Sequence, residues 1–277
     1  MTTLATALAG APPARAAELH PETVRAFDRY IHTNDERFKR DIKDGPFLWV
    51  DGQPEARRTA FYEQLHRGET VIEKIKVEVD GSELDVPDGI IHHWLGLVFI
   101  PGAKLADTLR VLQDYDNHAK YFAPDVARSK LLKHEGNFFK CYLRFHKKKV
   151  LTVVLDTDHE ATYDAVGPTR AVSRSRTTRI QEVENHDEAG ERLEPEGHDG
   201  GYMWRLNTYW RFEEKDGGTY VQCEGITLTR DIPFIIKPII GPYVTSIPKE
   251  SLLHTLGNTR KALLEREHAT PAAAKSQ

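Results

Sequence analysis

Apolar residues in the first part of the chain recur at the spacing of helices. Pro21-Glu22 suits the first turn of a helix, because proline fits that position and an acid complements the helix dipole. Val24, Phe27 and Tyr30 follow at helical spacing. Pro54 opens a second helix, and residues 69–79 then alternate as a strand does before the Asp80-Gly81 turn. We expect an N-terminal helical extension with one strand.

The next segment changes from a dense apolar run to helical spacing. Residues 90–100 are almost entirely apolar and are closed by Pro101-Gly102, which is typical of a buried strand. Leu105, Leu109 and Leu112 predict a helix over residues 104–113, and a second short helix is expected over residues 118–122. Pro124 ends this pair.

Alternating segments separated by turn residues fill the middle of the chain. The expected strands cover residues 126–133, 138–146, 150–163, 169–183, 202–214 and 220–229. A loop over residues 185–200 is the one long interruption. Strands at this spacing, joined by short turns, indicate an antiparallel meander.

The last part of the chain is apolar and helical. Residues 231–247 are apolar but carry three prolines, so we expect a lid or an irregular packing segment there. A helix is predicted from Pro248 to about residue 267. Its apolar stripe consists of Leu252, Leu253, Leu256, Leu263 and Leu264.

This order resembles the START-like (SRPBCC) helix-grip superfamily, which includes lipid-transfer domains and bacterial polyketide cyclases. The similar pieces are IIHHWLGLVFIPG, LQDYDNHAKYFAPDV, YWRFEEKDGGTYVQCE, TRDIP and SIPKESLLHTL, within residues 88–267. The resemblance implies an α+β fold, in which a curved antiparallel sheet wraps around a long C-terminal helix. The chain then divides into a signal-like or disordered tail (1–17), an N-terminal extension (18–87), a ligand-binding domain (88–267) and a disordered tail (268–277).

The turn Asp216-Gly217 predicts a register for the hairpin around it. In a two-residue hairpin Lys215 faces Gly218, so the pairs that follow are Phe212 with Val221, Trp210 with Cys223, Thr208 with Gly225 and Leu206 with Thr227. The opposite face carries Arg205, Asn207, Arg211, Gln222 and Glu224, so we take the first set as the inner face. Thr208 opposite Gly225 leaves little bulk, and free volume is expected there. The alternative is a bulge or bend at Gly225.

The same reasoning selects the remaining residues of a candidate ligand pocket. On one strand Phe139, Cys141, Leu143 and Phe145 share the inward face. Gly257 lies one turn beyond Leu253 on the C-terminal helix, where it either provides ligand room or allows close packing. The predicted pocket residues are Leu143, Phe145, Arg174, Arg176, Trp204, Leu206, Thr208, Trp210, Cys223, Gly225, Thr227, Tyr243, Leu253 and Gly257.

Arg174 and Arg176 have two interpretations. If their strand face is the inner one, they are cations suited to a carboxylate, phosphate or enolate. If it is the outer one, they are solvated charges. The alternation along residues 169–183 is too mixed to decide.

Catalytic and metal-binding motifs give no clear activity. The chain has no Gly-x-Ser-x-Gly, phosphate-binding glycine loop, His-Glu-x-x-His or Cys-x-x-Cys. His92 and His93 point to opposite faces of a strand and cannot share one metal, so a hydrogen-bonded core histidine is the simpler interpretation. Asp114 and Asp116 are better explained by helix capping than by calcium. We expect no metal and no cofactor, and keep Tyr243, His92 and His93 as acid or base candidates.

The charge is unevenly distributed. The 277 residues carry 38 Lys and Arg against 42 Asp and Glu, a net charge of −4 that excludes a strongly basic nucleic-acid binder. The loop 185–199 accounts for the acidity, with six acids and one base. Between Arg128 and Lys149 there are eight basic residues and one acid. This stretch is either a solvated face or a surface that docks to an anionic membrane.

Cysteines and the N-terminus bear on location. Cys141 and Cys223 are interpreted as buried thiols rather than a bridge. Residues 1–17 hold seven alanines and one charge, and Ala14-Arg15-Ala16 fits a signal-cleavage site, although a positive n-region is missing. We expect a periplasmic or secreted protein, with a cytoplasmic protein as the alternative.

Three functions follow from these observations. The first is binding or transfer of a hydrophobic small molecule, lipid-like or polycyclic, between the sheet and the C-terminal helix. The second is an enzyme of the polyketide cyclase or dehydratase type that uses the same cavity. The third is a structural or interaction domain with a filled core.

Overall fold

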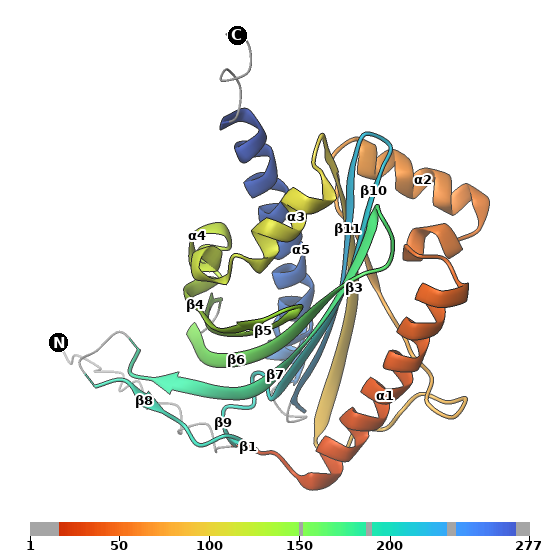
Figure 1. Ribbon diagram of the computed structural model, residues 1–277. Helices are drawn as coiled ribbons and strands as arrows, with labels where there is room; N and C mark the ends of the chain where they lie inside the picture. Colours follow the sequence, from red (N-terminus) through yellow and green to blue (C-terminus); the bar gives the residue numbers. More distant parts are fainter. Residues whose placement is uncertain (1–16, 150–151, 187–189, 232–236, 270–277) are drawn as a thin grey trace, which may run out of the picture.

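The structure is a computed structural model. It describes residues 17–149, 152–186, 190–231 and 237–269, with the backbone alone for 237–245 and 267–269. The expected tails, most of the first one and all but the start of the second, therefore lie outside the described residues, as does part of the expected lid. Helices lie on both sides of one large twisted sheet (Figure 1).

The N-terminal extension forms two helices and a short edge strand, as expected. It consists of β1 (Ala17–Glu18), α1 (Pro21–Asp44), the 3-10 helix η1 (Trp49–Gly52), α2 (Glu55–His66) and β2 (Val71–Lys74). Pro21 occupies the first turn of α1. The strand ends earlier than its alternation indicates, because Val77 packs against the apolar cluster beneath α1 instead of pairing with the neighbouring strand.

The sheet is antiparallel throughout. Its strands are β3 (Gly89–Pro101), β4 (Val126–Glu135), β5 (Phe138–Lys148), β6 (Thr152–Ala165), β7 (Arg170–Glu184), β10 (Arg205–Lys215) and β11 (Gly218–Arg230). The order across the sheet is β2-β3-β11-β10-β7-β6-β5-β4. Two short strands, β8 (Arg192–Leu193) and β9 (His198–Asp199), lie in the loop before β10 and pair with β7 and β1.

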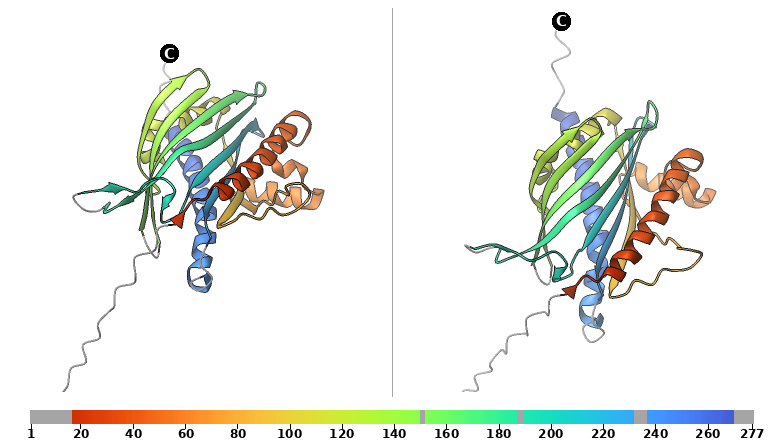
Figure 2. Two further views of the ribbon diagram at one scale, coloured as in Figure 1. Left: turned by 90° about the horizontal axis from the view of Figure 1, so that it is seen from below. Right: turned by 60° about the horizontal axis from the view of Figure 1, so that its bottom comes forward.

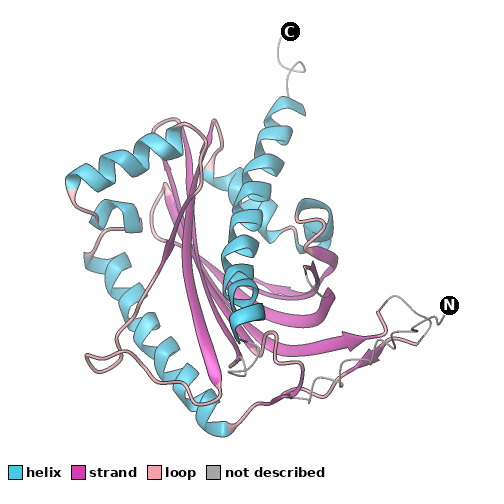
Figure 3. Ribbon diagram, turned by 180° about the vertical axis from the view of Figure 1, so that it is seen from behind, coloured by secondary structure: helices cyan, strands magenta, loops and turns pink. Residues whose placement is uncertain are grey.

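The inner face of the sheet is covered by α3 (Leu105–Gln113), η2 (Tyr115–Asn117), α4 (His118–Tyr121) and the long helix α5 (Lys237–Ala269). Figures 2 and 3 show α5 running along this face, with α1 on the opposite side. The sheet and α5 form the expected helix-grip arrangement of an α+β fold. Among the helices of the described residues, none combines the length and the apolar character needed to cross a bilayer.

Helix α5 begins earlier than expected. Its backbone is helical from Lys237, although the prolines predicted an irregular segment up to residue 247. Pro238 falls in the first turn, where a missing N–H costs no helical hydrogen bond. The expectation of irregular backbone was wrong for residues 237–247, whereas residues 232–236 lie outside the described part of the chain.

The hairpin register is confirmed. Lys215 pairs with Gly218, and the pairing continues without interruption through Trp210 with Cys223 and Thr208 with Gly225. Alternation therefore places the predicted inner residues of β10 and β11 toward α5. The opposite face is polar, as expected, but Arg211, Gln222 and Glu224 on it are buried, whereas Arg205 and Asn207 are half-buried.

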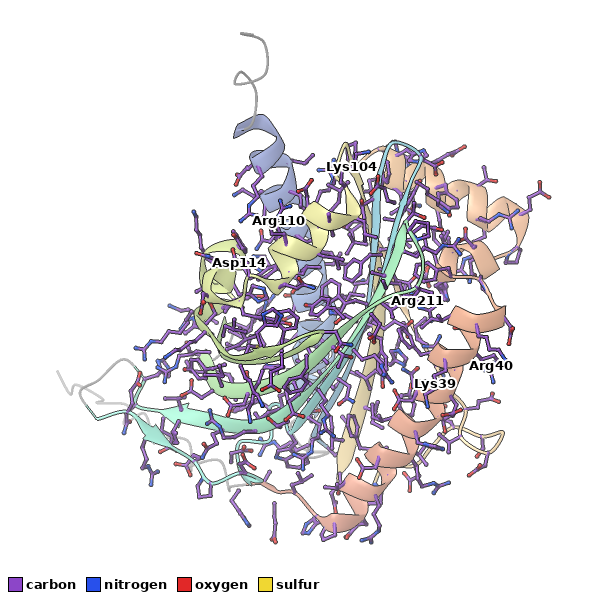
Figure 4. All side chains as sticks on the ribbon, in the orientation of Figure 1. Lys39, Arg40, Lys104, Arg110, Asp114 and Arg211 are labelled. Atoms are coloured by element: carbon purple, nitrogen blue, oxygen red, sulfur yellow. The ribbon has the colours of Figure 1, made fainter. Side chains whose placement is uncertain are left out.

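An ion network fills the space between α1 and the outer face. Glu224 is fully buried, its carboxylate accepts a hydrogen bond from His93 Nε2 (3.1 Å), and it pairs with Arg37 of α1. Arg211 is 1% exposed and donates to the carbonyl of Phe47 (2.8 Å) and to Asp41 (3.1 Å). Figure 4 labels Arg211 on the side of the sheet toward α1. These contacts fix the extension to the sheet.

His93 belongs to this network and is the hydrogen-bonded core histidine that the sequence favoured. Its Nδ1 accepts from the hydroxyl of Tyr30 (2.9 Å), so its Nε2 carries the proton donated to Glu224. Burial raises the pKa of Glu224, but the bond from His93 and the charges of Arg37 and Arg211 outweigh burial and lower that pKa to about 2. The carboxylate is ionised at any physiological pH.

Candidate functional site

A cavity of about 540 Å³ lies between α5 and the inner face of the sheet. This volume falls within the range of about 300–1,000 Å³ that is typical of small-molecule sites. The strands of its wall contribute alternate residues, with the consecutive pair Thr229 and Arg230 at the end of β11 as the exception. Its apolar lining includes Trp94, Leu112, Phe122, Val126, Leu143, Phe145, Leu155, Leu206, Trp210 and Leu252.

Eight of the predicted pocket residues line this cavity: Leu143, Phe145, Leu206, Thr208, Trp210, Cys223, Gly225 and Thr227. Cys141 also faces it, and Cys141 and Cys223 are buried free thiols, as expected. All of these residues come from β5, β10 and β11, whose alternation is regular. Clear alternation in the sequence is therefore what located them.

Gly225 borders open space. A β-carbon built on it would meet no heavy atom within 4 Å. Its register is continuous with Thr208 on one side and Trp94 on the other, so the alternative of a bulge at Gly225 was wrong. The missing side chain contributes directly to the volume between the two cavity tryptophans, Trp94 and Trp210.

Arg174 and Arg176 lie outside the cavity. Both are exposed on the outer face, and Arg176 pairs with Glu160. The cavity face of β7 instead carries Ser173 and Ser175. The interpretation as pocket cations was therefore wrong and the solvated alternative holds. The reason is that Ser173 pairs with inward-facing Trp210 of β10, which places the odd-numbered residues inside.

Three further predicted pocket residues, Trp204, Leu253 and Gly257, do not line the cavity. Trp204 precedes β10 in a bend, so alternation does not reach it; it is buried on the outer side, where its Nε1 donates to Asp199 (3.1 Å). Leu253 and Gly257 do not line the cavity, because the α5 face toward it carries Pro248, Ser251, Leu252 and Thr255. Gly257 is exposed. The side chain of Tyr243 lies outside the described residues.

Gly96 of β3, rather than Gly257, allows α5 to approach the sheet closely. A β-carbon at Gly96 would collide with the side chain of Leu256, which is fully buried. Leu256 and Leu252 pack on this glycine. We expected Gly257 of the helix to allow close packing. Instead, Gly96 of β3 allows it.

The far end of the cavity is polar and internally hydrogen-bonded. The hydroxyl of Tyr163 donates to the carbonyl of Leu112 (3.2 Å) and accepts from the hydroxyl of Tyr115 (3.0 Å). Burial raises the pKa of both tyrosines, so both stay protonated. This end therefore presents neutral hydroxyl groups to the cavity rather than charge.

Two histidines of the wall were not predicted as site residues. His118 Nε2 donates to the carbonyl of Leu112 (3.1 Å). The hydroxyl of Thr157 donates to the carbonyl of Leu143, so it accepts from His159 Nε2 (2.8 Å). In both rings Nδ1 is therefore unprotonated. The register of β6 on β5, which pairs Cys141 with His159, would have revealed His159 from the alternation of β5.

The hydrogen bonds of Asp114 and Asp116 show what these two aspartates do in the fold. No cluster of potential metal ligands occurs among the described residues. Asp114 accepts from Tyr121 (2.6 Å) and Asn117 (2.8 Å), and Asp116 accepts from the backbone N–H of Leu131 (2.9 Å). Asp114 occupies the N-cap position of η2, but its side chain makes no capping hydrogen bond, and Asp116 lies within η2. Capping by these side chains was therefore wrong. The aspartates connect the short helices to each other and to β4.

The buried histidines predict loss of stability in acid. Burial lowers the pKa of His92, His118 and His159 to about 4 each. A lowered pKa means that their stabilising contribution is fully present above the unfolded value near 6.5 and is lost as pH falls toward 4. Between pH 7.5 and pH 5, each of these histidines should lower the free energy of unfolding by about 2 kcal/mol.

Urea unfolding at the two pH values measures this effect. His118→Gln keeps the donor to Leu112 and removes the titration, so the difference in unfolding free energy should shrink by about 2 kcal/mol. His32→Gln, at an exposed position, is the matched control and should leave the difference unchanged. If the unfolding free energy of His118→Gln still differs between the two pH values as much as that of the native protein, His118 does not contribute to the loss of stability in acid.

Comparisons with known proteins show similarity only among solved structures. No family model matches the chain, and no curated protein matches its sequence. A STAR-related lipid transfer protein from Xanthomonas axonopodis aligns with 19% identity over 70% of this chain and 98% of that one, with a TM-score of 0.44. The Zhui aromatase/cyclase from a Streptomyces species aligns with 12% identity over 68% and 100%, with a TM-score of 0.42. Human STARD10 aligns with 8% identity over 78% and 84%, with a TM-score of 0.39. At these values the similarity carries no argument about what this chain does.

Proposed function

We propose that this protein binds a hydrophobic small molecule, lipid-like or polycyclic, between α5 and the sheet. The observation that carries the proposal is the cavity of about 540 Å³ with Gly225 facing open space. A cavity of this size, lined mostly by apolar side chains, has a favourable free energy of filling by an apolar ligand. It also argues against the third expectation, a domain with a filled core.

A fluorescence titration tests the proposal. Two of the four tryptophans, Trp94 and Trp210, line the cavity. The uncharged apolar probe N-phenyl-1-naphthylamine should bind with saturation and change their emission. In Trp210→Phe, which keeps an aromatic side chain, the emission change should fall by about half while the probe still binds. Emission that does not respond to the probe in the native protein contradicts the proposal.

A second proposal concerns delivery to an anionic membrane surface by the basic stretch from Arg128 to Lys149. Lys133 and Arg144 of this stretch have carboxylate partners, Glu135 and Asp156. Arg128, Lys130, Lys140 and Lys148 have none among the described residues. Leu132 of the edge strand β4 is 45% exposed beside these cations. Unpaired cations next to an exposed leucine suit a negatively charged lipid surface.

Liposome co-sedimentation measures this docking. Binding should rise with the fraction of phosphatidylserine and fall at 0.5 M salt, because a screened surface attraction weakens. The pair Lys130→Gln and Lys140→Gln should bind several-fold less. Lys39→Gln on α1, labelled in Figure 4, is the matched control. Binding that ignores lipid charge and salt overturns the proposal.

An enzyme of the cyclase or dehydratase type is the second candidate function. His92 and His93 do not line the cavity, whereas His118 and His159 do, with neutral rings at pH 7 and unprotonated Nδ1 atoms. Such a ring can accept a proton in a closed apolar site. Turnover of a polyketide-like substrate that is lost in His159→Gln, with ligand binding retained, would establish this candidate over simple binding.

A further inference from the structure

The mouth of the cavity carries excess positive charge. The charged side chains that line the cavity are Asp125, Lys147, Lys149 and Arg230, besides the neutral histidines. They come from the segment before β4, from the end of β5 and the residue that follows it, and from the end of β11. Asp125 and Lys149 contact His254 and Glu250 near the middle of α5. The other end of the cavity is formed by the neutral tyrosines Tyr115 and Tyr163. The cavity is therefore apolar in its body and cationic at one end.

Two cations contact aromatic rings of the cavity wall: Arg230, which itself lines the cavity, and Lys249 of α5, which does not. The guanidinium of Arg230 lies 6.0 Å from the ring centroid of Tyr202, which lines the cavity. The ammonium of Lys249 lies 5.5 Å from the ring centroid of Trp94, another wall residue. Neither makes an ion pair with any described carboxylate. An aromatic face attracts a cation but does not neutralise it.

The acids in this region are already engaged. Asp125 pairs with Lys147 (2.7 Å) and with His254 (3.3 Å), and Glu250 pairs with Lys149 (2.5 Å). Asp199 is near enough for its charge to interact with Arg230, but its carboxylate accepts hydrogen bonds from Gly201 and Trp204 instead. Among the described residues, neither Arg230 nor Lys249 therefore has a carboxylate within ion-pair distance. An unpaired cation beside an apolar cavity is suited to a ligand whose one end is an anion.

We propose that the ligand is an anionic amphiphile, with its apolar part in the cavity and a carboxylate or phosphate monoester held at the mouth by Arg230 and Lys249. This inference rests on the proposed binding function and specifies its ligand class. The planar guanidinium of Arg230 donates two parallel hydrogen bonds to such a head group, and the ammonium of Lys249 adds a point charge. The apolar tail fills the apolar body of the cavity, between this head group and the hydroxyl groups of Tyr115 and Tyr163.

Matched ligands of equal chain length test the proposal. Hexadecanoate and monohexadecyl phosphate should bind at least tenfold more tightly than hexadecanol to the native protein. In Arg230→Gln and in Lys249→Gln the two anions should lose five- to tenfold in affinity while hexadecanol is unchanged. Arg230→Lys, which keeps the charge but not the two parallel donors, should lose less affinity for the anions than Arg230→Gln. Lys39→Gln on α1 is the control, because Lys39 lies on the opposite side of the sheet and does not line the cavity.

The outcomes separate this inference from the function on which it rests. Equal affinity for the acid and the alcohol, or equal losses for both in the variants, overturns the anionic head group while the binding function stands. No binding of any of the three overturns the binding function itself. If inorganic phosphate binds as tightly as monohexadecyl phosphate, the alkyl group contributes nothing to the affinity. That result overturns the proposal of an amphipathic ligand and identifies a site for a free anion.

Discussion

Gly225→Leu is expected to weaken binding of an apolar ligand at least tenfold while leaving the fold intact. The new side chain would enter the cavity between Trp94 and Trp210, because a β-carbon at this position meets no atom within 4 Å. The backbone at Gly225 is regular strand paired on both sides, so a branched side chain imposes no strain. Replacing a strand glycine removes about 0.5–1 kcal/mol of entropic cost, so stability should hold or rise slightly.

Titration with N-phenyl-1-naphthylamine and urea unfolding measure the two halves of this prediction. Gly96→Ala is the matched control on the same face of the sheet. Its β-carbon would collide with Leu256, so it should cost about 1–3 kcal/mol of stability through displacement of α5. Undiminished probe binding in Gly225→Leu would show that the ligand does not occupy the space beside this residue.

Glu224→Gln is expected to destabilise the protein by about 3–5 kcal/mol, the cost of removing one partner from a buried ion pair. Glu224 and Arg211 are both almost inaccessible to water, and the carboxylate also receives the hydrogen bond of His93. When Glu224 loses its charge, Asp41 is the one carboxylate of this network that still pairs with Arg37 and Arg211. The extension should detach more readily from the sheet.

Urea unfolding measures this loss of stability, and a variant that breaks an exposed ion pair serves as the comparison. Glu160→Gln removes the partner of Arg176, an exposed pair, and should cost less than about 1 kcal/mol. Limited proteolysis should cut Glu224→Gln first within α1, since that helix is held by Arg37 and Asp41. A loss of stability as small as in Glu160→Gln would mean that the network does not hold the extension.

The sequence predicted the sheet and its inner face well where alternation was regular. The Asp216-Gly217 turn fixed the register of β10 and β11, and the inward residues of β5 followed from the same alternation. Along β7 the arginines and small residues obscured the pattern. The positions of Arg174 and Arg176 were settled by pairing with β10, which no single strand reveals.

The outer face shows what the sequence could not provide. Arg211, Gln222 and Glu224 look like solvent-facing residues, and each is buried. Arg211 and Glu224 contact Asp41 and Arg37, which lie 170 and 187 residues away in sequence, so only the tertiary arrangement brings these charges together. The same limit applies to Gly257, since the rotation of α5 about its axis depends on Gly96 beneath it.

Native mass spectrometry of the purified full chain shows whether the cavity holds a ligand. We expect an apolar or amphipathic molecule to copurify with the native protein, or to bind one to one from a lipid extract. Gly225→Leu should carry much less of this molecule. A native protein that stays at its bare mass after incubation with the extract, and equals Gly225→Leu in this respect, would contradict a ligand-binding cavity.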